Sequence, residues 1–538
     1  MKDLDKKFEN LPKEKFVFAN ENKNIHDKEL VTKPISYFRD AWNRFKRNKG
    51  SIFAAIVILI LVGYAIIVPM VSQYTVSYND IYYKATRPKI ELFSDLGWDF
   101  LDGCEDKDGM NEQTFFYYYS MGVETGHPAL KNQEFKKRQS EEVVNGEITS
   151  ANTYDVRLDY YHKAGVVYKE VQFSEYKQIQ EYQDKHNIQI IYPTTKNAID
   201  SNYAKENLAI QDHGDANFWF ETEIIATKTV AKVYYNEDGT FYFKNVYADY
   251  TGTDFYTSKM RVEDMSEGPK YDYARKINND SSFQIRVNYY EYYKFYHKEV
   301  LKDGIDEPSF IFGTNRTGQD LFTCLASGAR FSFVFAIVVA VINLVVGAIY
   351  GAIEGYYGGK IDLIMERIVE ILSSIPFMIV ITLLKYHMAK SGQVLILFIA
   401  FFLTGWIGMA GRTRMQFYRF KNQEYVLAAR TLGAKDLRIM FKHIFPNSLG
   451  TLITGCVLII PGMIFSETSL SYLGIINLNT GDRTSVGTLL ANGQTALVED
   501  PHIVLFPALF ISLLMLSFNL FGNGLRDAFN PSLRGSED

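Results

Sequence analysis

The chain is poor in cysteine: it has three in 538 residues, far apart at Cys104, Cys324 and Cys456. Cysteines so few and scattered argue against a disulfide framework or a cysteine-based metal cluster. The sequence also lacks a phosphate-binding G-x-x-x-x-G-K-[ST] loop, a zinc-type His/Glu cluster and a G-x-S-x-G elbow. These absences argue against an ATPase and a hydrolase, and they leave no catalytic residue and no bound cofactor or metal to assign.

Long apolar runs are what the sequence does contain. Residues 51–71 and 331–353 each run for about twenty residues without a charge, enough for a helix to cross a hydrocarbon core of about 30 Å. Shorter or more broken runs follow at roughly 368–384, 394–410, 449–466 and 503–521. The sequence therefore predicts six transmembrane helices. The first run lies behind a long polar stretch and is too long for the apolar core of a signal peptide, so we expect it to be retained.

Positive charge sets the expected orientation. Lysine and arginine are concentrated in segments that share one side of the membrane, above all 39–49 and 411–447, whereas the short loops on the other side hold only Lys385, Lys390 and Arg483. Because positive loops stay in the cytoplasm, both termini are expected to be cytoplasmic. The protein is therefore predicted to be a multi-pass protein of the bacterial plasma membrane.

The first fifty residues, 1–50, are predicted to form a cytoplasmic tail. Within it Ile35, Phe38, Trp42 and Phe45 recur at helical spacing opposite several cations. This pattern predicts an amphipathic helix that lies in the membrane interface, against lipid head groups. A simple cytoplasmic extension of the first span is the alternative.

Residues 72–310 are polar but rich in tyrosine and phenylalanine, which predicts a folded extracellular domain of mixed α and β structure between the first two spans. Segment 232–247 is expected to form a hairpin that turns at Asp238. Segment 174–187 is expected to form a helix with Ser174 as its cap.

Two segments of this domain share a pattern. YDVRLDYY (154–161) and FQIRVNYY (283–290) both read aromatic, any residue, β-branched, arginine, aliphatic, any residue, Tyr-Tyr. The pattern is consistent with a duplicated unit, with paired strands in one sheet, or with coincidence.

The segment EYVLAARTLGAKDLRIMFKHIFPN (424–447) lies between two predicted spans and carries helical apolar spacing on both sides of a Gly-Ala break at Gly433. A second helix is expected to begin at Lys435 or Asp436 and to end at Pro446. A basic loop would satisfy the charge rule without paired helices. The small residues at a tight turn instead favour docking into a groove of another protein, because they allow close backbone approach.

This segment resembles the EAA loop of ABC-transporter permeases, whose pattern is E-A-A, three residues, Gly, nine residues and I-x-L-P. The two alanines, the glycine and the proline are present, and Leu427 stands where the pattern has glutamate, with Glu424 one turn earlier. The resemblance implies that the coupling contact with an ATPase involves Glu424, Ala428, Ala429, Gly433, Ala434, Lys435, Asp436 and Pro446.

Further stretches resemble the C-type permease of oligopeptide and dipeptide ABC importers, namely 312–333, 354–379, 466–475 and 518–531. The resemblance implies a type I ABC importer permease fold, an α-helical polytopic membrane protein of six transmembrane helices. The permease core is then 311–530 with its coupling loop at 411–447, and 531–538 is a cytoplasmic tail. Typical members carry only a short loop where 72–310 stands.

The family implies a non-catalytic subunit and a set of partners: a homologous B-type permease, two cytoplasmic ATPases that bind ATP and Mg, an extracellular substrate-binding protein or lipoprotein, and a peptide. No nucleic acid is expected. We also expect the inserted domain to orient the binding protein, with mere shielding as the alternative.

Polar groups inside spans are costly and are therefore candidates for function. The translocation-path candidates are Asn343, Glu370, Ser373, Ser374, Glu467 and Thr468. Asn343 also suits an interhelical hydrogen bond, and Glu467 also suits a cap where the backbone leaves the bilayer.

Alternative functions remain at this point. Within the family, the solute could be a dipeptide, nickel or another small molecule, because substrate choice resides largely in the binding protein. In another class, the chain could be a membrane-anchored receptor or adhesin that uses its tyrosine-rich domain, in which case 424–447 would be dispensable.

Overall fold

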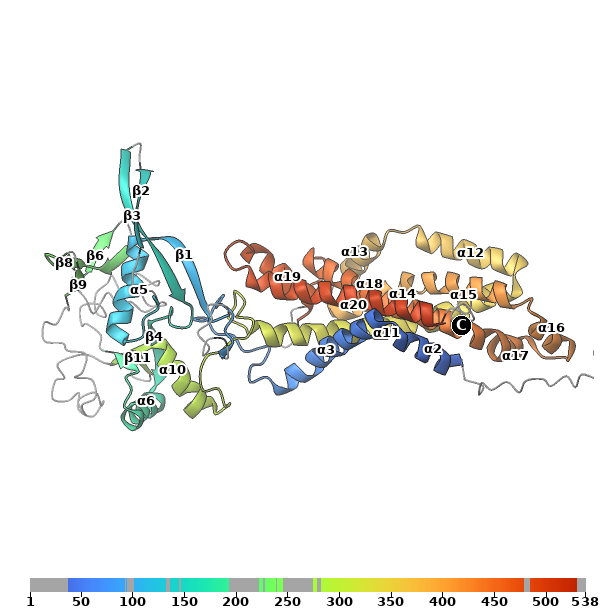
Figure 1. Cartoon of the computed structure of the whole chain (residues 1–538), viewed down its shortest axis with the longest axis horizontal. Coiled ribbons are helices and arrows are strands. Elements are labelled where there is room, and N and C mark those ends of the chain that lie inside the picture. The colour runs from blue at the N-terminus through green and yellow to red at the C-terminus, as the bar shows by residue number, and fades with distance from the viewer. Residues whose placement is uncertain are drawn as a thin grey trace, which may run out of the picture.

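The structure, a computed structural model, describes residues 37–91, 93, 101–131, 136–144, 147–192, 222–225, 228–238, 240–244, 274–277, 282–478 and 484–529. Figure 1 shows two parts arranged end to end, a bundle of long helices and a mixed domain of strands and shorter helices. The predicted tail 531–538 and most of 1–50 lie outside the described residues.

Five helices among the described residues are long and apolar enough to cross a membrane. They are α3 (Lys49–Val71), α11 (Leu321–Tyr357), the run Gln393–Phe420 made of α14 (Gln393–Gly405) and α15 (Ile407–Phe420), the run Asp436–Tyr472 that ends in α18 (Phe445–Tyr472), and α20 (His502–Phe529). Most of these helices extend well beyond the apolar runs of the sequence, because helical hydrogen bonding continues after the chain becomes polar.

The remaining predicted span is broken. Helices α12 (Gly359–Ser373) and α13 (Phe377–His387) meet at an angle of 72°, and only if this pair counts as one span does the total reach six. Pro376 precedes α13 as its N-cap residue. A proline disfavours the helical conformation in the residue before it, so the chain bends there.

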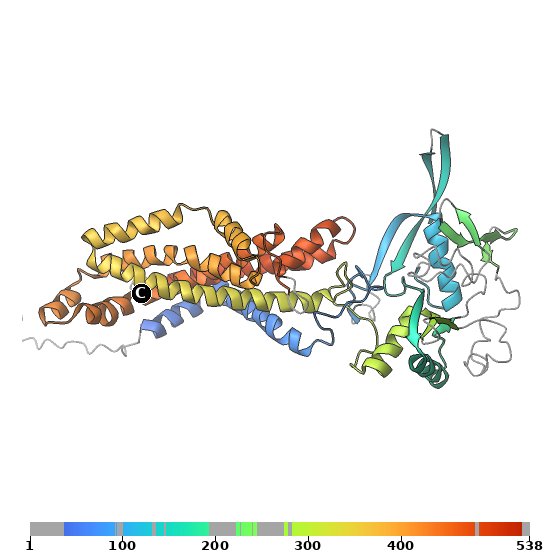
Figure 2. The same cartoon turned by 180° about the vertical axis from the view of Figure 1, so that it is seen from behind.

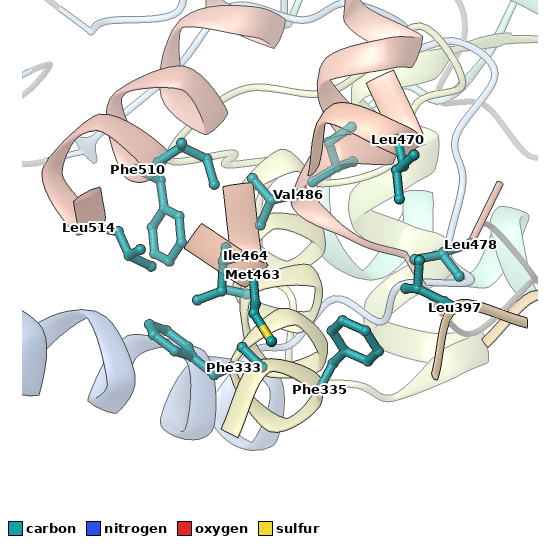
Figure 3. Close-up of a cluster of buried hydrophobic side chains, with 14 of the residues drawn as sticks. Phe333, Phe335, Leu397, Met463, Ile464, Leu470, Leu478, Val486, Phe510 and Leu514 are labelled. Atoms are coloured by element: carbon teal, nitrogen blue, oxygen red, sulfur yellow. The ribbon is translucent and has the colours of Figure 1, made fainter. Parts of the chain in front are cut away.

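Helix α11 lies at the centre of the bundle and packs against α3, α15 and α18. Figure 3 shows Phe333 and Phe335 of α11 together with Met463 and Ile464 of α18 and Phe510 of α20. These side chains are buried and hold three of the long helices together by dispersion contacts.

The contact between α11 and α15 depends on small residues. A Cβ atom on Gly347 would lie 2.6 Å from the carbonyl oxygen of Trp406, and one on Gly351 would overlap the backbone of Ala410. Glycines therefore let the two helix backbones touch, as they do in packed membrane helices.

A short helix precedes α3. Helix α2 (Tyr37–Arg47) places Phe45 against Phe521 of α20, with ring centroids 5.4 Å apart, and leaves Trp42 exposed. The predicted amphipathic helix is present. It packs one apolar side chain on the bundle and leaves another exposed.

The segment between α3 and α11 folds around two antiparallel sheets. One has the order β1 (Cys104–Asn111), β3 (Glu147–Asp159), β2 (Lys136–Val144), and the other has β10 (Ala274–Ile277), β11 (Ser282–Asn288), β4 (Val166–Gln172), with β5 (Ile191–Tyr192) also paired to β11. Helices α5 (Glu112–Thr125), α6 (Phe173–His186) and α10 (Tyr289–Phe295) and the π-helical turn η6 (Tyr296–Leu301) complete it, with the small pairs β6 (Thr222–Ile225)–β7 (Lys228–Ala231) and β8 (Val233–Tyr235)–β9 (Phe241–Phe243). We call this segment the inserted domain.

Predictions within the inserted domain had different outcomes. Strands β8 and β9 form the predicted hairpin, with Tyr234 opposite Tyr242. Helix α6 is present, but Ser174 is not its cap: the N-cap is Gln172, and Ser174 lies inside the first turn. The two segments that share a sequence pattern lie in β3 and β11, which belong to different sheets, so they are not paired with each other.

Candidate functional site

The segment 424–447 forms a helical hairpin at the end of the bundle opposite the inserted domain, as Figures 1 and 2 show. Helix α16 (Glu424–Thr431) ends in a turn at Gly433, whose φ of +80° lies in the left-handed region. The amide of Ala434 donates to the carbonyl of Ala429 at 3.1 Å and closes the turn. Only glycine adopts such a φ without strain, which explains a glycine at this point.

The second arm of the hairpin does not end at Pro446, so that prediction is wrong. Helix α17 (Asp436–Arg438) and the π-helical segment η7 (Ile439–Ile444) continue directly into α18. Pro446 falls in the first turn of α18. A proline is tolerated there because the N–H groups of the first turn have no partner within their own α-helix.

The hairpin has a buried face and an exposed tip. The buried face packs on Tyr356 of α11 and Phe417 of α15 through Val426, Ile439, Met440 and Ile444. The tip leaves three large apolar side chains exposed, Leu432 at 88%, Leu437 at 67% and Phe441 at 52%. Exposed apolar side chains in a basic segment are candidates for contact with another protein.

The predicted coupling residues divide between these two faces. Glu424, Ala428 and Lys435 are exposed on the hairpin surface, whereas Ala429 and Ala434 are half-buried. Asp436 begins the second arm and accepts a hydrogen bond from the Tyr356 hydroxyl at 2.7 Å. It therefore ties the hairpin to the end of α11.

Sequence reasoning missed an ionic cluster next to the hairpin. Arg414 of α15 lies 2.7 Å from Asp362, 3.0 Å from Glu366 and 3.5 Å from Glu354. The cluster joins α11, α12 and α15 at one end of the bundle. The only signal in the sequence is a set of acidic residues at 354–366, and nothing local indicates that they share one arginine.

Glu467 is buried where α18 meets α11. Ser332 of α11 donates to Glu467 Oε2 at 2.9 Å and Ser471 donates to Oε1 at 3.2 Å. Thr468 beside it is also buried. The hydroxyls satisfy a carboxylate that would otherwise be very costly at this depth, and they hold two long helices in register.

Asn343 is buried between α11 and the α14–α15 run. Its side chain lies against Gly405 and lines a cavity of about 220 Å³ together with Phe398 and Phe402. Neither polar atom of the side chain has a hydrogen-bond partner within the part of the chain that the structure describes. The interhelical hydrogen bond expected for Asn343 is thus not formed among the described residues.

Glu370, Ser373 and Ser374 lie exposed at the bend between α12 and α13. The Ser373 hydroxyl donates to the carbonyl of Glu370 at 3.1 Å, and the Ser374 hydroxyl donates to the carbonyl of Ile371 at 2.7 Å. The predicted translocation-path residues therefore lie at three separate places in the bundle and do not form one site. Among the described residues no group of His, Cys, Asp and Glu could hold a metal ion.

A second feature missed by sequence reasoning joins the inserted domain to the bundle. Arg87 donates to Glu105 of β1 at 2.6 and 2.9 Å, to Asp500 at 3.0 Å and to the carbonyl of Glu499 at 2.7 Å. Its guanidinium also lies 4.8 Å from the ring centroid of Tyr160. Arg87 thus connects a strand of the inserted domain to the loop that leads into α20.

Comparisons with known proteins agree with this arrangement. Residues 344–535 match the family described as binding-protein-dependent transport system inner membrane component, and residues 36–88 match the N-terminal TM domain of oligopeptide transport permease C. Residues 89–343, which hold most of the inserted domain, lie outside both matches.

Among curated relatives, the oligopeptide transport system permease protein OppC of Bacillus subtilis is 43% identical over 223 residues, covering 41% of this chain and 72% of that protein. The dipeptide transport system permease protein DppC of the same organism is 41% identical over 227 residues (41% and 69%), and OppC of Escherichia coli K12 is 40% identical over 229 residues (42% and 74%). A solved structure of the MetNI methionine ABC transporter, in an inward-facing conformation, aligns with a TM-score of 0.32 and 16% identity over 38% of this chain and 96% of that one.

The two family matches lie on both sides of the inserted domain's position, and the relatives are covered across most of their own length. They are membrane permease subunits and not enzymes. On this evidence the chain belongs to the family of binding-protein-dependent transport system inner membrane components, the permease subunits of ABC transporters, and is similar to its oligopeptide and dipeptide C-type members.

Proposed function

We propose that this chain forms half of the transmembrane path of an ATP-driven importer of oligopeptides. The relatives named above are oligopeptide and dipeptide permeases, which supports a peptide as the solute. A homologous B-type permease supplies the other half of the path. The buried Asn343 has no hydrogen-bond partner in the part of the chain that the structure describes, which is consistent with a path or a subunit contact completed by that second permease.

The observation that carries the proposal is the exposed apolar tip of the hairpin. Leu432, Leu437 and Phe441 project from a segment that is otherwise anchored to α11 and α15. Burying such side chains in a groove of an ATPase would stabilise the complex by roughly 1.5–3 kcal/mol for each fully covered residue. Because the hairpin continues into α18, movement of the ATPase would tilt that span and shift the balance between two states of the path.

The coupling test compares two exposed apolar positions at opposite ends of the helix bundle. Leu432→Lys should reduce copurification with both ATPase subunits and abolish uptake of a labelled oligopeptide, because a lysine cannot enter an apolar groove without losing its hydration. Val498→Lys, at a position that is 94% exposed near α20, is the matched control and should leave ATPase copurification unchanged. Normal copurification and uptake with Leu432→Lys would rule out the hairpin as the docking element.

We further propose that the hairpin end faces the cytoplasm and that the inserted domain is extracellular. The two features lie at opposite ends of the bundle, and the basic residues gather at the hairpin end, in agreement with the charge rule. An extracellular position places the inserted domain beside the mouth of the path, where a substrate-binding protein or lipoprotein delivers its peptide.

In this position the inserted domain scaffolds the binding protein. Strands β2 and β3 form a ribbon that projects away from the rest of the domain in both views, and Arg87 fixes the base of the domain to the loop before α20. A projecting ribbon on a fixed base suits an element that orients a large partner. A domain that only shields the mouth needs no such ribbon.

The structure indicates which residues to delete in a test of the scaffold role. Backbone hydrogen bonds join Ala85 to Asn315, Lys89 to Phe310 and Thr314 to Thr86, so residues 72–90 and 307–320 form a paired base that should be kept. Replacing 91–306 with a Gly/Ser linker should preserve assembly and basal ATP hydrolysis but sharply reduce stimulation by the loaded binding protein. Unchanged uptake at limiting binding-protein concentration would reject the scaffold role.

A further inference from the structure

A cavity of about 490 Å³ lies in the inserted domain, away from the transmembrane path. It is enclosed by β4, α10, η6 and the segment 78–82 that follows the first span, and six tyrosines contribute to its wall. A volume of about 300–1,000 Å³ with aromatic walls and a few polar groups is typical of small-molecule sites.

One cation in this cavity, Lys169, lies among tyrosine rings. The ammonium of Lys169 on β4 lies 5.6 Å from the ring centroid of Tyr82, 5.9 Å from that of Tyr289 and 5.1 Å from that of Tyr292. No ion pair within the described ranges includes Lys169, whose side chain is half-buried. Burial lowers the pKa of this lysine, and the charges of Asp80 and Glu175 raise it in part. An ammonium held among rings offers its donors to an incoming acceptor.

The carboxylates of the same cavity are placed differently. Asp80 is buried and accepts hydrogen bonds from the Tyr289 hydroxyl and from the backbone amide of Tyr82, so it is satisfied by the protein. Glu175 is half-buried, and its Oε1 accepts from the Tyr292 hydroxyl at 2.7 Å. With these carboxylates and Glu170 against one lysine, the lining is negative overall.

This charge pattern discriminates between ligand classes. A simple anion would be attracted by Lys169 but repelled by the carboxylates. A simple cation would be attracted by the carboxylates but repelled by Lys169. A zwitterion satisfies both. The tyrosine rings between the charged groups can cover peptide planes or an apolar side chain.

We propose that this cavity binds a zwitterionic ligand of the amino-acid or short-peptide class, its carboxylate on Lys169 and its amino group toward Glu175. The choice of a peptide rests on the proposed function, but the site lies outside the path and outside the residues matched by the family. Segment 78–82 connects to α3 and η6 leads toward α11, so a bound ligand lies between both chain segments that join the inserted domain to the membrane.

The test measures binding to the full chain in lipid nanodiscs by calorimetry, with trialanine as the probe. Trialanine should bind, and its C-terminal amide and its N-acetyl derivative should each bind at least about tenfold more weakly, because each loses a charge-assisted hydrogen bond. Lys169→Met keeps the apolar stem and should weaken trialanine binding to the same extent, and Glu175→Gln should remove the preference for a free amino group.

Lys177→Met is the matched control, since Lys177 also lies over a ring, that of Phe173, but does not line the cavity. It should bind trialanine as the unmodified chain does. The proposal is overturned if trialanine does not bind the unmodified chain, if Lys169→Met binds it equally well, or if the blocked peptides bind as well as the free one. A second experiment acetylates Lys169 with and without the substrate-binding protein. If the binding protein protects Lys169 while peptide does not bind, the proposal is also overturned.

These outcomes are separate from those that bear on the proposed function. If the complete transporter takes up peptide while trialanine fails to bind this chain, only the cavity assignment fails. If trialanine binds through Lys169 but the complete transporter shows no peptide-stimulated ATP hydrolysis, the peptide-import function fails and the site remains.

Discussion

Arg87 and Asp500 form an ion pair at 3.0 Å although 413 residues separate them in the chain. Arg87 follows the first span, and Asp500 precedes the last one. Both side chains are largely buried, at 8% and 14% exposed. The segment that leaves the first span and the segment that enters the last one are thus joined at the base of the inserted domain, which ties its position to that of α20.

Replacing Arg87 with Met should loosen this joint. The substitution removes the nearest counter-charge of Glu105 and Asp500 and leaves them Lys107 at 3.0 Å and Arg316 at 3.9 Å, which costs up to about 3 kcal/mol. The measurement is the unfolding of the inserted domain in the full chain and the hydrogen exchange of residues 85–89. Arg138→Met is the control, because the pair of Arg138 with Asp155 is half-exposed and is worth at most about 1 kcal/mol. Equal hydrogen exchange of residues 85–89 in the two variants would show that Arg87 does not fix the base of the inserted domain.

The stability of the inserted domain should depend on acid pH through Asp159. Burial alone raises the pKa of this carboxyl, but the hydrogen bond from His162 and the charges of His162 and Lys131 outweigh it and lower the pKa to about 2. The unfolded value is about 3.9. Because the folded pKa is the lower one, this stabilisation is complete above about pH 4 and is lost as the pH falls to 2, an effect of about 2–3 kcal/mol.

Urea unfolding of the inserted domain at pH 5, 3.5 and 2.5, followed by tyrosine fluorescence, measures this dependence. Asp159→Asn should flatten it over that range, whereas Asp108→Asn, at an exposed position on β1, should keep it. A slope that survives in Asp159→Asn would assign the acid sensitivity to another group.

Substitutions of Gly433 should impair coupling because they disfavour its backbone conformation, and not because the new side chain meets other atoms. Its φ is +80°, and a Cβ at this point would meet no atom within 4 Å. Gly433→Asp should leave the protein inserted and assembled but abolish transport-stimulated ATP hydrolysis, whereas Gly433→Asn should retain more activity than a β-branched substitution such as Gly433→Val, because asparagine tolerates the left-handed region.

Gly411→Ala is the control for Gly433. Gly411 also has open space around its Cβ position but lies in α15 with ordinary helical geometry, so an alanine there should leave uptake intact. Normal coupling in Gly433→Val would show that the turn geometry does not matter for docking.

The orientation of the chain can be read from single cysteines. Lys435→Cys should react with a membrane-impermeant thiol reagent only after the cells are opened, and Asp238→Cys should react in intact cells once any cell wall is permeable. Both positions are exposed. Cys104→Ser is the background, although burial raises the pKa of Cys104 to about 12 and keeps its thiol unreactive. The reverse labelling pattern would invert the topology.

Local sequence was sufficient for features that depend on neighbours along the chain. The apolar runs predict the long helices because bilayer length and the cost of unpaired backbone groups act on each segment separately. The β8–β9 hairpin and the turn at Gly433 follow from turn chemistry within a few residues. The permease family was indicated for a similar reason, because its motifs are short and lie in order.

Errors arose where one local choice competed with another. Ser174 is a residue type that often caps helices, but β4 runs on to Gln172, which becomes the cap, so the helix begins two residues earlier than expected. Proline often ends a helix, but Pro446 lies in the first turn after the π-helical segment, where the lack of an N–H group costs little.

The arginines of the shared pattern in β3 and β11 show the limit of sequence reasoning. Arg157 is partly exposed and pairs with Asp102 and Asp106, whereas Arg286 is fully buried against Glu124. Identical local patterns therefore have different partners. Charge, turn propensity and hydropathy are properties of the sequence itself. The partner of Arg87 and the enclosure of Lys169 were decided only by tertiary structure, because they depend on how distant backbone segments pack and exclude water.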